Sequence, residues 1–493
     1  MEKSPQNSMT IISKWGSVLV LIGFVFLSWR CTVDSSMKKE VEGNYELNLT
    51  ITEAERSTGV KVYFSSNKDL STRTYLEVAG NGYKVIRESE GQTDVWKTYE
   101  GIGNLPWEIY LLKKGNFFRY SVNNITGYIR GPMGEWQGKY DPWKAYVGLE
   151  APEDVVIESF TVTTLPWLSH ASEPIITIGP KGSFYEKQII PGAILNYKGT
   201  YYMYVMAGME GNEEGSSRRT IGVATSKDLE NWKVHPEPLI TYEDYPYDNL
   251  YVNGVVETPE GKIAIMFAAQ VFPEWKGFML ATADNPFGPF EPYADNPVYK
   301  HYTHAHEFDL IQVDHPDYRY ILFYSGFTTE PKSGPVGDRG YVLYSNDLKH
   351  WKEHPQNPVF SPQTLDNWDA VHIRPRSLNK IGDDWYVWYE GCNQWTPPGT
   401  ELHGWWDTVG LARSKDLVNW EYYPRNPALP GLGISAEQFD NRWVGWPRMV
   451  VKDDIGYVFY TGNARVGLRK IPLNQLTNWN SEGGKIIDLL AGY

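Results

Sequence analysis

The chain has 493 residues, which is too long for one ordinary hydrophobic core, so two or three domains are expected. Its formal net charge of −14 argues against nucleic acid as a partner, because nucleic-acid binding needs a basic surface. The 20 Trp and 34 Tyr residues suit contact with sugar rings, although strands use the same residues for packing.

Residues 1–31 predict export. Lys14 precedes an apolar run from Trp15 to Trp29, which is shorter than the roughly 20 residues that span a bilayer and fits a signal segment. Cys31 follows and resembles the lipidation site of a bacterial lipoprotein, which implies a cell-surface or periplasmic protein held to a bacterial membrane by this segment alone. Small residues are expected just before such a cysteine, whereas Arg30 stands there, so an uncleaved signal anchor is the alternative. With Cys31 lipidated, only Cys392 remains, which excludes an internal disulfide.

Residues 40–169 predict a β-sandwich. Short alternating stretches, such as 60–64 and 155–162, are separated by glycine turns, and no helical period of useful length occurs. The segments 114–123 and 157–162 resemble jelly rolls of the concanavalin or laminin-G type. Such modules either bind sugar as accessory domains or brace the neighbouring domain.

A segment that ends in an aromatic residue recurs through the rest of the chain. Three copies share the pattern Ser-x-Asp-Leu-x-x-Trp, at residues 226–232, 345–351 and 414–420, and two degenerate copies lie at 283–290 and 474–479. The repeat length is about 60 residues. The terminal aromatic residues are Trp232, Phe290, Trp351, Trp420 and Trp479.

Each repeat also contains an aromatic strand. These strands lie at residues 201–204, 263–267, 320–324, 385–389 and 457–460. Several strands per unit at this period are typical of a β-propeller, whose blades stack around a central channel. The chain is therefore predicted to be all-β, with the sandwich followed by a five-bladed propeller over residues 173–493.

The closing Ser-x-Asp-Leu-x-x-Trp segment and the aromatic strand resemble glycoside hydrolase families 43 and 32 and their relatives. The resemblance covers about residues 173–493 and implies cleavage of a glycoside within the channel of a five-bladed propeller. Some relatives of these families are phosphorylases, and fold alone does not choose among the activities.

One column of titratable residues repeats where the inner strands begin. With the repeats aligned on their aromatic strands, the column consists of Glu186, Asp248, His304, Asp369 and Asp440. The first strands of a propeller line its channel, so a ring of titratable groups is expected at one level. For Asp369 and Asp440, the alternative is an Asp that caps a turn within its own blade.

Glu307 is the predicted general acid. The resembled families place this acid in a Glu-x-Pro motif on the first strand of blade 3, where this chain has Glu307-Phe308-Asp309, with Asp309 in place of the proline. A glycosidase needs one carboxylic acid that stays protonated, and burial or neighbouring carboxylates favour that state. The alternative role for Glu307 is to bind sugar hydroxyls.

The sequence does not fix the partner carboxylate. The resembled families have an Asp directly before the proline of blade 1 and another at the corresponding place in blade 2, but this chain has Ile190 and Val252 there. Glu186, Asp248 or Asp369 is therefore expected to act as base or nucleophile, unless the chemistry differs.

Histidines and aromatic residues are expected to bind substrate around Glu307. His304, His306 and His372 can hydrogen-bond hydroxyls, transfer protons or hold a metal, but no compact ligand motif accompanies them, so no metal site is predicted. Trp446 is expected to stack on a sugar or to seal a blade interface. Other tryptophans with the same expectation are Trp395, Trp405 and Trp406.

Arginines on the same segments have two interpretations. They either grip a carboxylate or sulfate of an acidic glycan or pair with the acidic column itself. They are Arg374, Arg376, Arg442 and Arg448. Asp309 and Asp440 complete the predicted substrate-binding set.

These patterns predict a glycoside hydrolase that acts on plant or algal oligosaccharides or polysaccharides. The alternatives are a surface glycan-binding protein without catalysis and a glycoside phosphorylase. No cofactor is expected, although the channel leaves room for a structural divalent cation.

Overall fold

The structure is a computed structural model, and its two compact units, Met1–Trp167 and Leu168–Tyr493, are described separately below. The predicted signal segment and Cys31 lie outside the described residues. Among the described residues, no helix is long and apolar enough to cross a membrane. The described residues are 36–42, 45–55, 59–66, 68, 71–89, 91–114, 117–130, 144–164, 173–208, 218–242, 245, 247–271, 274–303, 305–328, 337–362, 368–392, 408–424, 426–429, 439–440 and 444–479.

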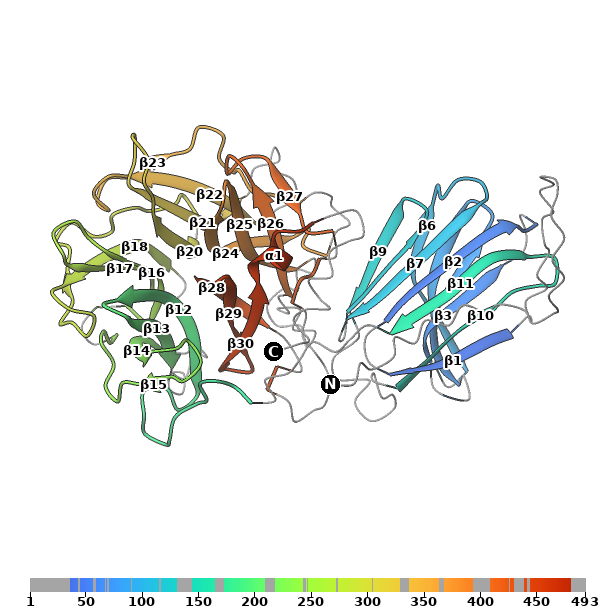
Figure 1. Cartoon of the computed structure of the whole chain (residues 1–493), viewed down its shortest axis with the longest axis horizontal. Helices are drawn as coiled ribbons and strands as arrows, with labels where there is room; N and C mark the ends of the chain where they lie inside the picture. The colour runs from blue at the N-terminus through green and yellow to red at the C-terminus, as the bar shows by residue number, and fades with distance from the viewer. Residues whose placement is uncertain are drawn as a thin grey trace, which may run out of the picture. The chain divides into compact units, whose positions relative to one another are not determined.

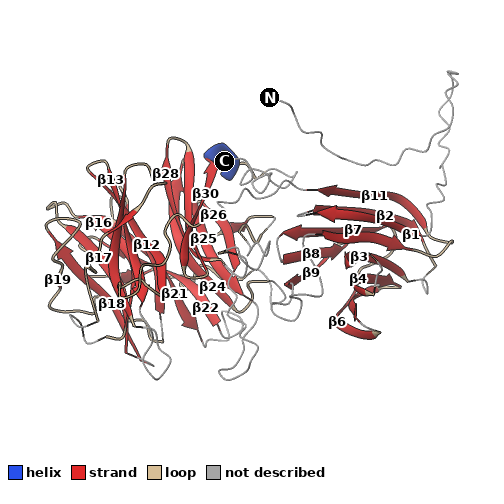
Figure 2. Ribbon diagram, turned by 90° about the horizontal axis from the view of Figure 1, so that it is seen from below, coloured by secondary structure: helices blue, strands red, loops and turns tan. Residues whose placement is uncertain are grey.

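The first unit consists of two stacked β-sheets (Figure 1, Figure 2). The six-stranded sheet contains, in spatial order, β1 (Ser36–Glu42), β10 (Lys144–Glu150), β3 (Val60–Ser66), β4 (Thr72–Ala79), β5 (Gly82–Ser89) and β6 (Gln92–Glu100). The five-stranded sheet contains β11 (Val156–Thr164), β2 (Tyr45–Glu53), β7 (Trp107–Lys114), β8 (Phe117–Val122) and β9 (Ile125–Arg130).

One apolar core lies between these two sheets. In β2, Leu47, Leu49 and Ile51 are buried at every second position, as expected for a strand with one face inward. They belong to the same cluster as Val62 and Leu76 of the six-stranded sheet. The described strands of this unit thus form two sheets that enclose one core.

The second unit consists of five blades, and the described strands form antiparallel sheets around a ring (Figure 1). Blade 1 contains β12 (Gln188–Tyr197), β13 (Thr200–Gly208), β14 (Arg219–Ser226) and β15 (Lys233–Val234). Blade 2 contains β16 (Asn249–Glu257), β17 (Ile263–Val271), β18 (Glu274–Ala283) and β19 (Glu291–Pro292). Blade 3 contains β20 (Ala305–Gln312), β21 (Tyr320–Thr328), β22 (Gly337–Ser345) and β23 (Lys352–Glu353). Blade 4 contains β24 (His372–Ile381), β25 (Asp384–Cys392), β26 (Thr408–Ser414) and β27 (Trp420–Tyr422). Blade 5 contains β28 (Gly445–Lys452), β29 (Ile455–Gly462) and β30 (Arg465–Pro472), followed by helix α1 (Leu473–Leu476).

The first strand of each blade contacts the first strands of its neighbours. The contacts run from β12 through β16, β20 and β24 to β28, which contacts β12 again. Blades 2 and 3 even share one continuous sheet, because β16 and β20 pair in parallel at Gly254 and Leu310. The predicted five-bladed propeller is confirmed, and its inner strands surround the channel.

The repeated Ser-x-Asp-Leu-x-x-Trp segment is a turn between the third and fourth strands of a blade. In blade 1, the Asp228 carboxylate accepts hydrogen bonds from the backbone N–H groups of Glu230 and Asn231, at 2.9 and 2.8 Å, and Ser226 Oγ accepts one from Leu229 N at 2.9 Å. Trp232 Nε1 donates to Leu229 O at 2.9 Å. Blade 3 repeats all of these contacts and blade 4 repeats those of the aspartate and the tryptophan, which explains why the pattern recurs.

A short extended segment pairs with the third strand at the outer side of every blade. In blades 1 to 4 this segment follows the fourth strand, and the pairs are Ile221 with Ile240, Phe278 with Tyr299, Gly340 with Phe360, and Val409 with Leu429. In blade 5 the corresponding partner of Val466 is Ile176, which comes from the beginning of the unit. Backbone hydrogen bonds at 2.9 Å join Ile175 N to Val466 O and Val466 N to Ile176 O. The second unit therefore completes its last blade with a segment from its own beginning. This segment, residues 174–176, is called the closing strap below.

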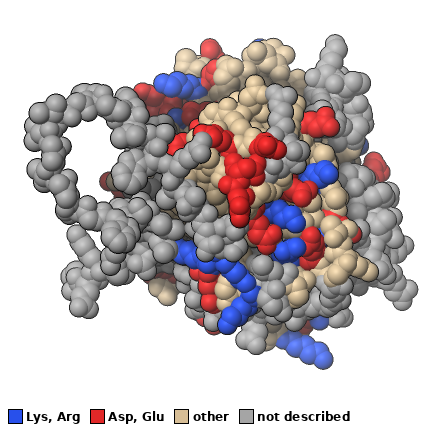
Figure 3. Space-filling model, turned by 90° about the vertical axis from the view of Figure 1, so that its right-hand side faces the viewer, with Lys and Arg blue, Asp and Glu red and all other residues tan. Residues whose placement is uncertain are grey.

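Charged side chains of both signs are interspersed on the face of the molecule drawn in Figure 3. The described acidic side chains gather near the centre of this face, with Lys and Arg beside them.

Candidate active site

Each inner strand of the propeller contains a β-bulge. The register shifts fall between Pro191 and Ile194, Val252 and Gly254, Ala305 and Phe308, Pro375 and Ser377, and Gly445 and Arg448. A bulge re-aims the side chains within it and is over-represented beside active sites. Five polar or aromatic residues lie within these bulges, namely Asn253, His306, Glu307, Arg376 and Trp446.

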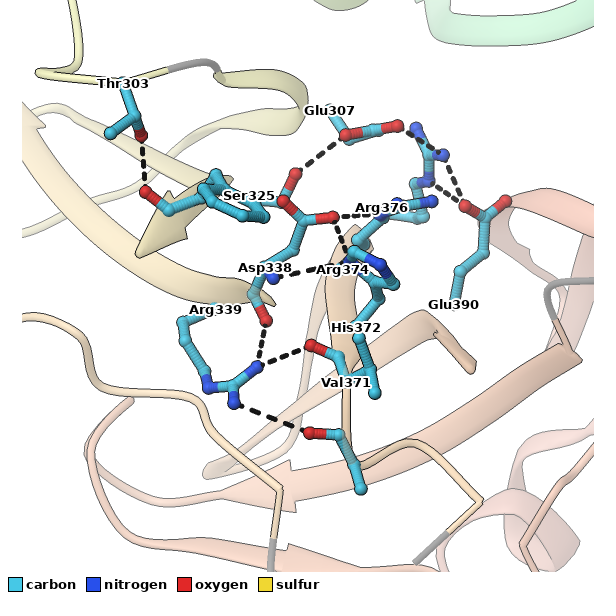
Figure 4. Close-up of polar contacts among 12 residues, drawn as sticks. Thr303, Glu307, Ser325, Asp338, Arg339, Val371, His372, Arg374, Arg376 and Glu390 are labelled. Atoms are coloured by element: carbon cyan, nitrogen blue, oxygen red, sulfur yellow. Dashed lines mark hydrogen bonds and ion pairs between the residues drawn. The ribbon is translucent and has the colours of Figure 1, made fainter. Parts of the chain in front are cut away.

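Glu307 is bound by groups from two blades (Figure 4). Ser325 Oγ of β21 donates to Glu307 Oε2 at 2.7 Å, and Arg376 Nη2 of β24 donates to Glu307 Oε1 at 3.0 Å. Glu307 is 1 % exposed and Arg376 is also 1 % exposed. The predicted acid is thus a buried carboxylate that bridges blades 3 and 4.

A second buried carboxylate, Glu390, shares the same guanidinium. Glu390 lies on β25, and its Oε2 accepts hydrogen bonds from Arg376 Nε, at 2.9 Å, and from Arg376 Nη2. Its Oε1 accepts a hydrogen bond from the backbone N–H of Trp446. Because Arg376 Nη2 contacts both carboxylates, the nearest oxygens of Glu307 and Glu390 lie within two hydrogen-bond lengths, or roughly 6 Å.

Trp446 adds an aromatic ring to this pair. The ring is half-buried, and the Arg376 guanidinium carbon lies 3.6 Å from its centroid. Tyr251 of blade 2 lies nearly parallel to Trp446, with a centroid distance of 6.1 Å and an interplanar angle of 12°. Trp446 therefore contacts the residue that holds the two carboxylates.

Arg448 reaches across the channel from blade 5. Its guanidinium donates to Asn253 Oδ1 of blade 2, to Phe308 O at 3.0 Å and Asp309 Oδ1 at 3.3 Å in blade 3, and to Arg376 O in blade 4. It is 4 % exposed, and burial lowers its pKa to about 10, against the opposing effect of Asp309. One side chain thus ties four blades together beside Glu307 and Arg376.

Asp309 is the carboxylate that Arg448 contacts in blade 3. Its Oδ2 accepts a hydrogen bond from the backbone N–H of Leu378 at 2.7 Å. Burial raises the pKa of Asp309 to about 6, although the Arg448 charge and the Leu378 N–H favour its ionised form. The Asp309 side chain nevertheless keeps 16 % of its surface accessible to solvent, so it is not completely buried.

A third acidic group, Asp338 of β22, binds two predicted substrate-binding residues. Its Oδ2 lies 2.7 Å from His372 Nδ1 and accepts a hydrogen bond from Arg374 Nε (Figure 4). All three residues are at least nine-tenths buried. The structure therefore brings His372 and Arg374 together through a carboxylate that the sequence argument did not consider.

Asp369 and Asp440 share one arrangement in blades 4 and 5. Tyr389 Oη donates to Asp369 Oδ2 at 2.9 Å, and Tyr460 Oη donates to Asp440 Oδ2 at 2.7 Å. Both aspartates are completely buried, and Asp440 also accepts a hydrogen bond from Arg469 Nη2 at 3.0 Å. These hydrogen bonds lie within the aspartates' own blades.

Blade 3 has the same arrangement with a histidine. His301 Nδ1 lies 3.0 Å from Tyr324 Oη, and His301 packs against Gly326 as the two aspartates pack against Gly391 and Gly462. A Cβ at any of these glycines would overlap the packed side chain. His301 thus occupies in blade 3 the place that Asp369 and Asp440 occupy in blades 4 and 5.

The remaining predicted residues lie apart from this cluster or outside the description. Glu186 accepts a hydrogen bond from the backbone N–H of Gly182 within a local turn. The backbone N–H of Asp248 donates to Gln270 O at 2.8 Å. His304 and Arg442 lie outside the described residues, as do Trp395, Trp405 and Trp406, and the side chain of His306 is not described.

Among the described residues, no group of three or more His, Cys, Asp or Glu side chains is arranged to hold a metal ion. The Arg448 guanidinium supplies positive charge between blades 2, 3 and 4. No metal site was predicted from the sequence, which left room only for a structural divalent cation in the channel.

The sequence argument missed Glu390, Asp338 and Asn253. Glu390 had a visible signal, because the residue after the aromatic strand is Val205, Ala268, Ser325 and Thr461 in the other blades and charged in blade 4 alone. Asn253 carried a weaker signal as the residue after Val252. Glu390 and Asp338 lie on a second and a third strand, outside the inner-strand column from which the site was predicted.

No family model matches the sequence, and no curated protein matches it. Solved structures do resemble it. A glycosyl hydrolase from Bacteroides ovatus is 14 % identical with a TM-score of 0.48, and the match covers 63 % of this chain and 95 % of that one.

Two further solved structures also resemble this chain. A thermostable family-43 glycoside hydrolase is 16 % identical with a TM-score of 0.43, covering 58 % of this chain and 89 % of that one. A protein from work on the GH130 family, described as mannoside phosphorylases that include hydrolases of β-1,2 mannosidic linkages in Candida mannan, is 14 % identical with a TM-score of 0.48, covering 63 % and 94 %. Likeness at this level does not assign a function to this chain.

Proposed function

We propose that the propeller is a glycosidase that cleaves O-glycosidic bonds of plant or algal oligosaccharides or polysaccharides, with Glu307 and Glu390 as its two carboxylates. The observation that supports this most is their common contact with Arg376 Nη2, which holds the carboxylate oxygens within roughly 6 Å of each other. In retaining glycosidases the two carboxyl groups are about 5–5.5 Å apart, against about 6.5–9.5 Å in inverting ones. The proposed reaction therefore keeps the anomeric configuration.

The hydrogen bonds assign different roles to the two acids. Glu390 accepts from Arg376 and from the Trp446 N–H, and N–H donors favour an ionised carboxylate, as a nucleophile requires. Glu307 receives one guanidinium contact and the Ser325 hydroxyl, which can rotate to accept a hydrogen bond from a protonated acid. Glu307 therefore suits proton donation to the leaving oxygen.

The charge balance supports a proton within the pair. Three acids, Glu307, Glu390 and Asp309, face the two guanidinium groups of Arg376 and Arg448, so full ionisation of the acids leaves one net negative charge. Uptake of one proton removes that charge, and the proposal places this proton on Glu307. One protonated acid beside one carboxylate is the state from which a double displacement starts.

A specific observation favours a second candidate, a glycan-binding protein without catalysis. Glu307 is 1 % exposed and Glu390 is wholly buried, and both contact Arg376, which is how a structural ion pair also looks. The phosphorylase alternative needs a guanidinium for phosphate, and Arg374, Arg376 and Arg448 already contact carboxylates.

The test is sugar release by the full chain and by its E307Q and E390Q variants on neutral and acidic plant and algal oligosaccharides. We expect cleavage with retained configuration by the wild type and a loss of at least 100-fold in either variant, because E307Q removes the acid and base and E390Q removes the nucleophile. The exposed Glu291 of β19 provides the control E291Q, which should match the wild type.

Three outcomes separate the candidates. Glycan binding without release by any protein would favour the binding protein. Release that requires added inorganic phosphate would favour the phosphorylase. Wild-type release that persists in E307Q and E390Q would remove this acid pair from the mechanism.

We also propose export with lipid attached at Cys31, and this proposal rests on the sequence alone. The measurement is the mass of the N-terminal peptide from the membrane fraction of cells producing the wild type or C31S. A diacylglycerol mass on the wild-type peptide supports it, and an unmodified cysteine in a membrane-bound protein would favour the uncleaved signal anchor.

A further inference from the structure

The backbone of Trp446 has a conformation that large side chains rarely adopt. Its φ is 54°, in the left-handed region, and the residue lies within the bulge of β28. A bulky residue at positive φ persists only where the surrounding structure holds it, and such residues gather at functional sites. The groups that this conformation positions, the Trp446 N–H and the indole ring, are therefore expected to have a function at the site.

The left-handed conformation directs the Trp446 N–H at Glu390. That N–H donates to Glu390 Oε1, while Arg376 occupies Oε2 of the same carboxylate. Both oxygens of the proposed nucleophile are thus held by N–H donors. Residue 446 and Glu390 come from blades 5 and 4, so this contact fixes one blade against the other at the site.

The ring of Trp446 contacts Arg376 as well. The guanidinium carbon lies 3.6 Å from the ring centroid, which is a close cation–π contact. A guanidinium stacked on an aromatic ring keeps a fixed plane, and the directions of its N–H groups follow from that plane. By fixing the plane of the guanidinium, the Trp446 ring fixes the position from which Arg376 Nη2 donates to Glu307 and Glu390.

The stack continues beyond Trp446. Tyr251 lies parallel to the indole, and the Arg219 guanidinium carbon lies 4.9 Å from the Tyr251 centroid. Arg219 Nε donates to Gln188 Oε1 at 3.2 Å. Residues of blades 4, 5, 2 and 1 therefore form one layered series, so Trp446 is supported by protein groups from several blades.

We propose that Trp446 is a positioning residue that sets the geometry of the two carboxylates, through its N–H on Glu390 and through its ring on Arg376. This rests on the proposed function and deepens it. It also differs from the stacking role expected from the sequence, in which Trp446 would bind sugar and set affinity.

A glycine at this position separates the two roles, because it adopts positive φ freely and so keeps the N–H in place while it removes the ring. For W446G we expect kcat to fall at least tenfold, KM to stay within threefold, and the pH–rate profile to shift. W446F, which keeps an aromatic face over Arg376, should recover part of the lost kcat. W96G, in the first unit, is the matched Trp-to-Gly control and should leave the kinetics unchanged.

A KM that rises at least tenfold in W446G, with kcat and the pH profile retained, would overturn the proposal in favour of a sugar-stacking residue. A second measurement does not depend on turnover. In protein labelled with ¹³C at glutamate carboxyls, with the Glu390 signal assigned from its loss in E390Q, W446G or W446F should change the pH titration of that signal. An unchanged titration in folded W446G and W446F would also overturn the proposal, whereas absence of sugar release by the wild type would count against the proposed function alone.

Discussion

Charge in the centre of the propeller is shared among residues rather than paired one to one. Arg376 serves two carboxylates, and Arg448 serves one carboxylate, one amide and two backbone carbonyls. Removing one member of such a set leaves a buried charge without compensation, which costs more than the contact contributes. The same sharing explains why the arginines in this cluster contact acids of the protein itself.

Asp309 gives this arrangement a pH dependence. Burial raises its pKa to about 6, so the folded protein binds a proton that the unfolded chain has released above about pH 4. The free energy of unfolding should therefore fall as pH rises from about 4 to about 6, by up to roughly 3 kcal/mol, and the contribution should stay constant above that range.

The measurement for Asp309 is urea unfolding of the wild type and D309N between pH 4 and pH 7. The variant has no titrating group at this position, so its stability relative to the wild type should rise across this interval. D284A, at an aspartate that is 87 % exposed, is the control and should follow the wild type. Parallel curves for D309N and the wild type would show that Asp309 does not titrate in this range.

At the scale of the elements, one turn explains most of the sequence repeat. In blades 1 and 4, the carboxylates of Asp228 and Asp416 accept backbone N–H groups two and three residues later. These hydrogen bonds hold the pKa of both aspartates well below its usual range. In blade 2 this role passes to Asn285, whose Oδ1 accepts from Phe287 N at 2.9 Å.

The role of this turn predicts how three aspartate substitutions change the free energy of unfolding. D228A and D416A should each lower the free energy of unfolding by roughly 1 kcal/mol, because each leaves backbone donors without their acceptor. D284A, which precedes Asn285, should change it by less than about 0.5 kcal/mol. The double variant D228A/D416A should show the sum, since the turns lie in different blades. Equal effects for all three single variants would contradict the assigned role.

At the scale of the whole molecule, blade count was predictable because each blade repeats the same turn and aromatic strand. The cluster around Glu307 was less predictable, because its members Glu390 and Asp338 lie on second and third strands and reach residues of the inner strands through side-chain contacts. The closing strap was also missed. Its signal was a proline before two apolar or aromatic residues, which recurs at 174–176, 238–240, 297–299, 358–360 and 427–429.

The strap makes blade 5 dependent on distant residues. Ile176 is 5 % exposed and Ile240, its counterpart in blade 1, is 2 % exposed, so I176A and I240A should each cost about 2–4 kcal/mol. Hydrogen exchange should distinguish them. I176A should speed amide exchange in β30, and I240A in β14. Unchanged exchange of β30 in I176A would show that the strap does not hold the ring closed.

The closing strap also affects the order in which the blades are completed during synthesis. Blades 1 to 4 can each acquire their outermost segment soon after their third strand leaves the ribosome, because that segment follows closely in the chain. Blade 5 emerges last, and its outermost position belongs to residues made before any blade existed. A new chain start placed between blades 4 and 5, with the original ends of this unit joined by a linker, would make strap and blade 5 neighbours in sequence. Such a circular permutant would turn the ring's most distant pairing into a local one. Blade 5 would then be completed at the start of translation, and the contact between β24 and β28 would close the ring last.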